Sequence, residues 1–446
     1  MPEVVTRDPA TGRELGRYPA HDEAAVEQAL AETAAAAPGW AATPLGERLA
    51  LLRTVGKLLT ERRDEYAALI TAEMGKPLAE SLAEIDKCAW NCSVVADLAP
   101  EWLADRPVSA SAAQSWISYE PLGVIFAVMP WNFPFWQVLR FACAALAAGN
   151  TALLKHSPDV TGCALAIEEL FESLQPGLFR ALVIDAGRVA DVSRRIILDP
   201  RIAAVTLTGS ERAGAAVAEA AGTACKKTVL ELGGSDPFVV LADASISAAA
   251  DAAARSRFGN AGQSCVAAKR FIVVEEVADE FVAALLASLE TTQIGPLARA
   301  DLRDNAIRQI EETVAAGARL LTGGRPVDGP GYFLEPAVLD HVTPGMAAFT
   351  EETFGPVAAV VRARDDDHAV ALANDTDFGL GCSVWGATGH ALAVGRRIRS
   401  GALFVNAPVA SDPRLPFGGI GRSGHGRELS AEGVREFTNL RTVAVA

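Results

Sequence analysis

The chain of 446 residues is poor in metal ligands, with 6 histidines and none in an HExxH or similar spacing. We therefore expect no metal site. Its 7 cysteines form no CxxC pair, and their number is odd. The first residues show no apolar core and no basic leader. These absences favour a reduced, cytoplasmic chain over a secreted, disulfide-bonded one.

The chain also lacks an excess of basic residues and a long uninterrupted apolar run. Lys and Arg number 40 against 55 Asp and Glu, for a net charge of −15, whereas nucleic-acid binding needs clustered basic residues. The most apolar region, 124–154, is interrupted by prolines and by polar and charged residues. It predicts a buried segment and not a membrane helix. The expected partner is a small molecule, not nucleic acid or a membrane.

Short apolar runs alternate with amphipathic stretches over residues 120–406, which predicts an α/β fold with two parallel sheets. The expected strands are 123–128, 151–155, 203–208, 228–232, 237–241, 270–274, 356–361, 381–385 and 402–406. The helices between them include 161–174, 211–221, 246–258, 279–289 and 365–374. The first hundred residues are expected to be mainly helical, with Asp22 capping a helix to Ala37 and a second helical pattern over 44–74.

Residues 102–119 depart from the helical pattern, because polar residues alternate there. This alternation predicts an exposed β-ribbon. An open ribbon edge favours pairing with another subunit or domain.

Two glycine-rich segments compete as phosphate-binding loops. Residues 419–424 match GxGxxG, but the chain ends too soon after them for the required βαβ unit, so we expect a structural turn. Residues 208–214 follow an expected strand and open an expected helix, whose N-terminal N–H groups suit a pyrophosphate. An ordinary strand–helix turn with Ser210 as its cap explains that segment equally well.

Four segments carry the residues that chemistry would use. They are PWNFP with Asn132, ELGG with Glu231, GQSC with Cys265, and EETFGP with Glu352. A lone buried cysteine is usually a small hydrophobic residue. A strand-end glutamate and an asparagine in a turn are equally ordinary when each is taken alone.

Taken together and in this order, the four segments resemble the aldehyde dehydrogenase superfamily. Glu231 and Cys265 lie 34 residues apart, as in the family, and the similarity runs from Val5 to residues 422–429. The segment ASDPRLPFGGIGRSGHGRELS most resembles the bacterial succinate-semialdehyde dehydrogenase branch. The resemblance implies two Rossmann-like parallel-sheet domains and a β-ribbon oligomerisation element. The implied division is 1–102 with 122–233 for NAD(P), 234–434 for catalysis, and 103–121 with 435–446 for the ribbon.

The resemblance also implies the chemistry. Cys265, as a thiolate, attacks an aldehyde carbon to give a thiohemiacetal. The Asn132 amide and the Cys265 backbone N–H hold the oxyanion. After hydride transfer to nicotinamide, Glu231 activates the water that hydrolyses the thioester. Glu428 stands where the family often has a second carboxylate in a water relay.

The expected cofactor is NAD or NADP. The residues implied to bind it are Trp131, Lys155, Ser157, Thr208, Gly209, Ser210, Glu352 and Phe354. Members that prefer NAD carry a glutamate three residues after the lysine, where this chain has Pro158. No carboxylate is then expected to repel a 2′-phosphate, and His156 and Ser157 are expected to help hold one, so that NADP is accepted.

The implied substrate residues are Arg140, Trp136, Ser411 and Phe417. Arg140 stands where succinate-semialdehyde enzymes bind the substrate carboxylate, although a helix-surface arginine explains it equally well. The second carboxylate-binding arginine of some members is replaced by Gly259, and Ser411, Arg414 or Arg257 are candidates to compensate. A lysine that many members carry nine residues after the asparagine is replaced by Phe141.

Other functions remain open at this point. The runner-up is a broad dehydrogenase for aliphatic or aromatic aldehydes. A CoA-acylating relative is disfavoured by Glu231, because water activation would waste the thioester. A cysteine hydrolase or acyltransferase needs a histidine beside the thiol, and none is near Cys265 in sequence. A catalytically silent homologue would not need Cys265, Glu231 and Asn132 together. Either a homodimer or a homotetramer is compatible with the sequence.

Overall fold

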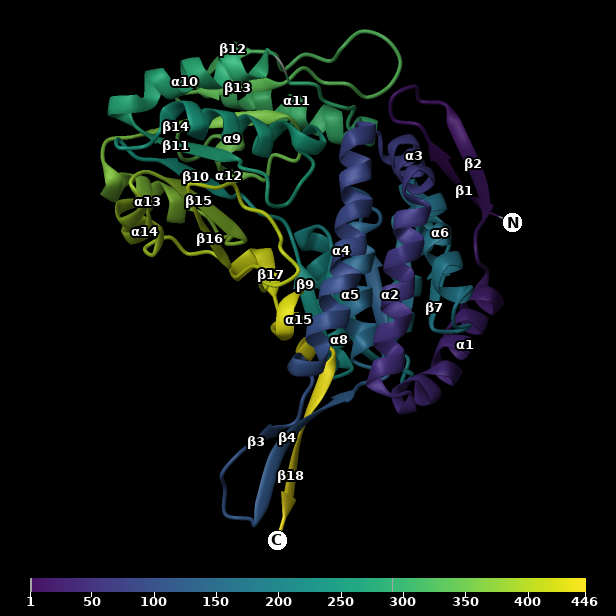
Figure 1. The fold of residues 1–446 in the computed structure, drawn as a ribbon. Helices are drawn as coiled ribbons and strands as arrows, with labels where there is room; N and C mark the ends of the chain where they lie inside the picture. Colours follow the sequence, from purple (N-terminus) through teal and green to yellow (C-terminus); the bar gives the residue numbers. More distant parts are fainter. Residues whose placement is uncertain (1, 291) are drawn as a thin grey trace.

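The structure is a computed structural model that describes residues 2–290 and 292–446. It contains a six-stranded sheet, a seven-stranded sheet and a long antiparallel ribbon that projects from the body (Figure 1). The two large sheets are parallel except for one edge strand each. This arrangement confirms the predicted α/β fold with two parallel sheets. Among the described residues, no helix combines the length and the apolarity needed to cross a membrane.

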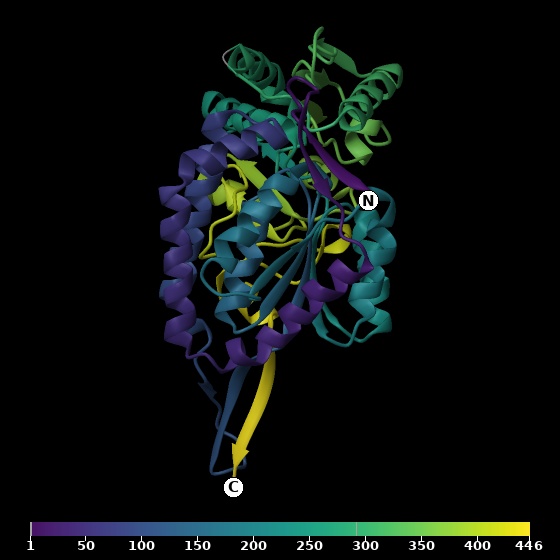
Figure 2. The ribbon, with the colours of Figure 1, turned by 90° about the vertical axis from the view of Figure 1, so that its right-hand side faces the viewer.

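The first sheet has the strand order β17-β9-β8-β5-β6-β7. Its strands are β5 (Val124–Met129), β6 (Thr151–His156), β7 (Phe179–Leu182), β8 (Ile202–Thr208), β9 (Lys227–Glu231) and β17 (Gly424–His425). Helices lie on both sides of this sheet (Figure 2), those of residues 45–172 on one face and those of residues 23–42 and 189–223 on the other. Because both faces are covered, the central strands read as continuous apolar runs. All six residues of β6 are buried.

The helices of this half are α1 (Glu23–Ala42), α2 (Leu45–Glu61), α3 (Arg63–Met74), α4 (Leu78–Trp102), α5 (Trp136–Ala147), α6 (Thr161–Glu172), α7 (Val189–Leu198) and α8 (Glu211–Thr223). Asp22 caps α1, as predicted, and its side chain accepts a hydrogen bond from the Ala25 N–H at 2.9 Å. The helical pattern over 44–74 divides into α2 and α3 at Arg62. A hairpin of β1 (Glu3–Arg7) and β2 (Glu14–Pro19), not predicted from the sequence, precedes them.

Helix α5 is buried on every side and carries site residues. All of its 12 residues are buried, which explains why the most apolar part of the sequence lies here and not in a membrane. Two polar side chains, Gln137 and Arg140, interrupt this apolar surface. Since a buried polar group needs partners, both must be bonded inside the protein.

The second sheet has the order β12-β13-β14-β11-β10-β15-β16. Its strands are β10 (Pro237–Val240), β11 (Arg270–Val274), β12 (Arg319–Thr322), β13 (Ala337–Asp340), β14 (Val357–Ala363), β15 (Gly381–Trp385) and β16 (Ala402–Val405). Its helices are α9 (Ile246–Phe258), α10 (Glu275–Leu289), α11 (Ala300–Ala315), α12 (Ala347–Thr350), α13 (Asp366–Asn374) and α14 (Thr388–Gly395). Short 3₁₀ turns are η1 (Pro158–Val160), η2 (Ala186–Arg188), η3 (Gly259–Gly262) and η4 (Gly421–Ser423).

The ribbon consists of β3 (Arg106–Pro107), β4 (Gln114–Pro121) and β18 (Thr438–Val445), with β4 in the middle. Before the chain enters β18, it returns to the first sheet. There β17 pairs with β9, and α15 (Ser430–Glu436) contacts α4 and α5. Residues 424–436 therefore pack against the first sheet and its helices.

Candidate active site

Two cavities of about 350 Å³ each meet at Cys265. We call the first the aromatic cavity. Its lining includes Lys87, Phe133, Trp136, Arg140, Arg255, Ser411 and Phe417. We call the second the helix-end cavity, because it lies at the N-terminus of α8. Its lining includes Trp131, Asn132, Thr208, Gly209, Ser210, Glu352 and Phe354. Cys265 and Gln137 line both, so one thiol faces two separate spaces.

The loop that carries Cys265 has a strained backbone. After α9 ends at Phe258, Asn260 and Ala261 adopt left-handed φ angles of 53° and 51°. Such angles are costly for residues with a side chain and persist only where bonding holds them. The Asn260 N–H donates to Glu80 at 2.8 Å, and its side chain donates to the Asn132 and Gln263 carbonyls. These bonds join the loop to the PWNFP segment.

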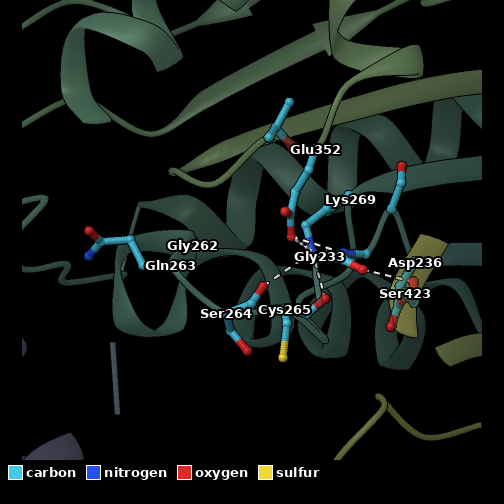
Figure 3. Close-up of polar contacts among 12 residues, drawn as sticks. Gly233, Asp236, Gly262, Gln263, Ser264, Cys265, Lys269, Glu352 and Ser423 are labelled. Carbon is cyan, nitrogen blue, oxygen red and sulfur yellow. Dashed lines mark hydrogen bonds and ion pairs between the residues drawn. The ribbon is translucent and has the colours of Figure 1, made fainter. Parts of the chain in front are cut away.

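Lys269 holds the loop from behind (Figure 3). Its Nζ donates to the carbonyl oxygens of Cys265 at 2.7 Å and Ser264 at 3.2 Å, and lies 3.4 Å from a Glu352 oxygen. The same Glu352 oxygen accepts the Gly234 N–H at 3.0 Å. The Cys265 sulfur points away from this network (Figure 3), so the network fixes the backbone and leaves the thiol free. Sequence reasoning missed Lys269, because nothing in its spacing marks it.

The two glycines of ELGG allow the close packing of this region. A Cβ at Gly234 would lie 2.9 Å from the Cys265 carbonyl oxygen, so a larger residue would displace the loop. The Ser423 hydroxyl donates to the Gly233 carbonyl at 2.7 Å (Figure 3). The GxGxxG segment at 419–424 is thus a structural turn that ties the C-terminal segment to ELGG, as expected.

The side-chain amide of Asn132 makes two hydrogen bonds inside the protein and keeps one N–H hydrogen for a ligand. Its Nδ2 donates to the Gln263 carbonyl at 2.9 Å, and its Oδ1 accepts from Gln137 at 2.9 Å. These two bonds fix the plane of the amide. An amide nitrogen carries two hydrogens, so the second remains for a ligand in the helix-end cavity, which Asn132 lines.

The thiol and the strand-end carboxyl both lie in surroundings that disfavour their charged forms. Burial raises the pKa of Cys265 to about 12, while Arg140 and Lys269 act in the opposite direction. Glu231 ends β9, and burial together with the neighbouring Glu428 raises its pKa well above the usual range. Both Glu231 carboxyl oxygens lack a hydrogen-bond partner among the described residues. Glu231 lines neither cavity, so it stands back from the thiol.

Arg140 is a buried residue, which excludes the helix-surface interpretation. Its Nε forms an ion pair with Glu428, and the two side chains are 3% and 1% exposed. Its Nη2 donates to the Thr208 hydroxyl at 3.3 Å, and the guanidinium lies 4.7 Å from the Phe417 ring centre. Glu428, expected in a water relay, is instead the counter-ion of Arg140. Arg140 thus lines the aromatic cavity with its charge already balanced.

The helix-end cavity suits a dinucleotide phosphate. Ser210 caps α8 by accepting the Ala213 N–H at 3.3 Å and also lines the cavity, so both interpretations of this residue hold. The remaining N–H groups at the start of this helix face a site for an anion. Trp131 and Phe354 meet edge to face, with ring centres 5.7 Å apart, and form an apolar wall.

The residues expected around the adenosine ribose differ from expectation in two ways. His156 cannot hold a phosphate, since one ring nitrogen bonds the Pro134 carbonyl and the other the Ser157 N–H, and burial lowers its pKa to about 4. The second difference is that a carboxylate, that of Asp159, directly follows Pro158. Asp159 accepts from the Ser157 hydroxyl at 2.9 Å and from Arg299 at 2.8 Å.

Lys155 lies at the same end of β6 and is buried, and burial lowers its pKa to about 8. Neither Lys155 nor Ser157 lines the helix-end cavity. These two residues therefore lie beyond the wall of that cavity.

Two of the three candidates for a second substrate-binding group are engaged elsewhere. Arg257 is fully buried and donates to the backbone carbonyls of Ala268 and Gly262. Arg414 is exposed and pairs with Asp412. Ser411 does line the aromatic cavity. Within residues 2–290 and 292–446, no group of three or more His, Cys, Asp or Glu side chains is placed to hold a metal ion.

Comparisons with known proteins identify the family. The model described as "Aldehyde dehydrogenase family" matches residues 2–443. A probable succinate-semialdehyde dehydrogenase [NADP(+)] of Synechocystis is 47% identical over 99% of this chain and 100% of its own. The succinate semialdehyde dehydrogenase [NAD(P)+] Sad of Escherichia coli is 45% identical, covering 99% and 97%.

A solved structure of succinic semialdehyde dehydrogenase from Streptococcus pyogenes, in complex with NADP+, superposes with a TM-score of 0.95 at 34% identity and covers 99% of both chains. Sequence and fold therefore agree, and the chain belongs to the aldehyde dehydrogenase family.

Proposed function

We propose that this enzyme oxidises succinate semialdehyde to succinate, with NAD or NADP as the hydride acceptor. The observation that carries the proposal is the position of Cys265, a nucleophile shared by a cavity with cationic side chains and a cavity at a helix N-terminus. The relatives named for this substrate and for NADP+ support it.

The aromatic cavity supplies the substrate side. Trp136, Arg140, Ser411 and Phe417 line it, as the resemblance implies for substrate residues. An aldehyde in this cavity meets the Cys265 sulfur, and attack on its carbon forms a C–S bond and an oxyanion. The free Asn132 amide hydrogen and the Cys265 backbone N–H stabilise that oxyanion. Each such donor contributes ~100-fold or more in rate.

The helix-end cavity supplies the cofactor side. Gly209 and Ser210 offer backbone and hydroxyl groups to the pyrophosphate, and Thr208, Glu352 and Phe354 surround the space toward Cys265. These residues would hold a nicotinamide cofactor beside Cys265, and the cofactor would supply the hydride-accepting chemistry of the oxidation. Lys155 and Ser157 complete the proposed set at the far end of β6.

Glu231 then serves the hydrolytic step. The carbon attached to the Cys265 sulfur is now a thioester, and Glu231 takes a proton from the water that attacks it. The acid leaves and the thiol is restored. In the present arrangement Glu231 must turn toward Cys265, and no hydrogen bond from a described residue holds its carboxyl oxygens back.

We further propose that the ribbon joins subunits into a dimer or tetramer. Strand β18 pairs with β4 on one edge and with no described strand on the other. An open edge of eight residues invites a second copy. We also propose that the chain divides into its two domains at residue 233. A cytoplasmic location is proposed as well, because all seven cysteines are free thiols. Light scattering of the full chain and of a chain ending at 437 tests the ribbon.

The experiment is an initial-rate matrix of succinate semialdehyde, butanal and benzaldehyde against NAD and NADP, without CoA. We expect acid to form in all active combinations, with the highest kcat/KM for succinate semialdehyde. Equal rates on the uncharged aldehydes would favour the broad-specificity alternative. No reduction of either nucleotide would favour the cysteine hydrolase.

A further inference from the structure

The aromatic cavity contains an unbalanced cation. Its lining includes three basic side chains, Lys87, Arg140 and Arg255. Arg140 is neutralised by Glu428 in a buried ion pair. A carboxylate approaching Arg140 would therefore also meet the negative charge of Glu428, and the pair offers it no net attraction.

The acidic residues of the same lining do not balance Lys87. Glu84 pairs with Lys76 at 2.6 Å, and its other oxygen accepts the N–H groups of Phe135 and Trp136. Glu80 accepts the Asn260 N–H. Both carboxyl groups are committed to holding the scaffold.

Lys87 projects from α4 and is half-buried. Its Nζ donates to the Ser411 hydroxyl at 2.7 Å and lies 4.5 Å from the Trp136 ring centre. No carboxylate lies within ion-pair distance of it among the described residues, and the neighbouring Asp412 pairs with Arg414. An ammonium group has three donors, so at least one remains for a ligand.

We propose that Lys87, together with Ser411, binds the carboxylate of the substrate and provides a half-buried positive charge in the aromatic cavity, where Arg255 is exposed to solvent. This inference rests on the proposed function and assigns its carboxylate subsite. Trp136 holds the ammonium from one side through its ring face. The sequence offered no motif for Lys87, because it lies outside every segment that carries the family resemblance and meets Ser411 only in the fold.

The environment of Lys87 adds a pH dependence. Burial lowers its pKa to about 8; the neighbouring Arg140 also lowers it, and Cys88, Glu84 and Asp412 raise it. Glu80, Arg255 and Cys265 are the other titratable groups of the cavity lining. Above about pH 8 the ammonium loses its proton, so the KM for a carboxylated aldehyde rises there. An uncharged aldehyde does not show this rise.

The test compares the full-length wild type with Lys87→Met, Lys87→Gln and Lys87→Arg. The measured quantity is the ratio of kcat/KM for succinate semialdehyde to that for butanal at about pH 7. We expect Lys87→Met and Lys87→Gln to lower this ratio by ~10- to 100-fold through KM, since a charge-assisted hydrogen bond is lost. Lys87→Arg retains most of the ratio. Arg255→Gln changes it less than Lys87→Met, and Lys57→Met, an exposed lysine on α2, is the matched control.

A binding measurement complements the kinetics. Calorimetric titration with succinate gives a weaker affinity for Lys87→Met and Lys87→Gln, while reduced nucleotide binds as in the wild type. The inference is overturned if the ratio is unchanged, or if both aldehydes lose equally and succinate affinity is retained. A larger effect of Arg255→Gln also overturns it. If the wild type itself shows no preference for succinate semialdehyde, the proposed substrate fails instead, which is a distinguishable result.

Discussion

The buried pair of Arg140 and Glu428 leads to a sharp prediction about stability. In Arg140→Met, Glu428 stays 1% exposed without its counter-ion. A lone buried carboxylate neutralises by taking up a proton rather than remaining charged. Burial already raises the pKa of Glu428 while the arginine is present, so its removal raises it further.

The loss of stability in this variant equals the free energy needed to keep Glu428 protonated in the folded state. Holding a proton on a carboxyl whose unfolded pKa is about 4.3 costs ~3.7 kcal/mol at pH 7 and ~1.6 kcal/mol at pH 5.5. The folded variant binds a proton that the unfolded chain releases, so its stability falls as pH rises from the unfolded pKa toward the raised folded one. The penalty relative to wild type therefore grows by about 2 kcal/mol between these two values. The estimate at neutral pH agrees with the ~3–5 kcal/mol found for breaking a buried pair.

Urea unfolding followed by tryptophan fluorescence at the two pH values measures this penalty. Arg140→Met combined with Glu428→Gln is the control, because it removes both charges and should recover most of the loss with no pH trend. An Arg140→Met protein as stable as wild type at pH 7, or a penalty that does not change with pH, would refute the reasoning. The result also separates a structural role of Arg140 from a role in substrate binding.

Three further predictions concern the site itself. Asn132→Ala should lower kcat by ~100-fold or more while nucleotide binding, measured by fluorescence titration, is retained; a smaller loss would show that the amide is not the oxyanion donor. Glu231→Gln should give one rapid turnover of reduced nucleotide and then a stable acyl group on the protein, visible by mass spectrometry, and steady turnover would contradict its role as base. Asp159→Asn should free Ser157 and the Nη1 of Arg299, whose other nitrogens stay paired with Asp301, and tighten 2′,5′-ADP binding by ~10-fold relative to 5′-ADP, measured by calorimetry. Unchanged relative affinity would place the phosphate elsewhere.

The sequence predicted the elements whose pattern is strong and local. Strands such as β11 and β15 have the bounds expected of them, because short apolar runs between helices leave few alternatives. The short β7 and β13 and the hairpin at residues 3–19 were missed, since strands of four to six residues carry little periodicity. The single helical pattern over 44–74 hides a break at Arg62, where neither proline nor glycine marks the end.

A motif in the sequence indicates where the backbone of a site residue lies, but it does not indicate the direction in which the side chain points. Asn132, predicted from its motif, is joined to the loop that carries Cys265 by a hydrogen bond to the Gln263 carbonyl, which Asn260 also bonds. His156 was expected to reach a phosphate, but its ring turns inward to a backbone carbonyl. Lys87 and Asp159 became visible only through the partners that the fold brings beside them, which no spacing in the sequence encodes.

Burial makes the ionised forms of Cys265 and Glu231 rarer, but it also makes each ionised form more reactive. It raises the pKa of Cys265 to about 12, so at neutral pH the resting site holds a thiol, and it raises the pKa of Glu231 well above its usual range. The same shift makes each ionised form, once produced, more basic and more nucleophilic than it would be in water. The resting protein is thus protected from adventitious reaction at the one thiol that both cavities reach. Activation then requires that a proton leave Cys265. The positive charges of Arg140 and Lys269, which lower the pKa of Cys265, are the groups of this chain that favour this step.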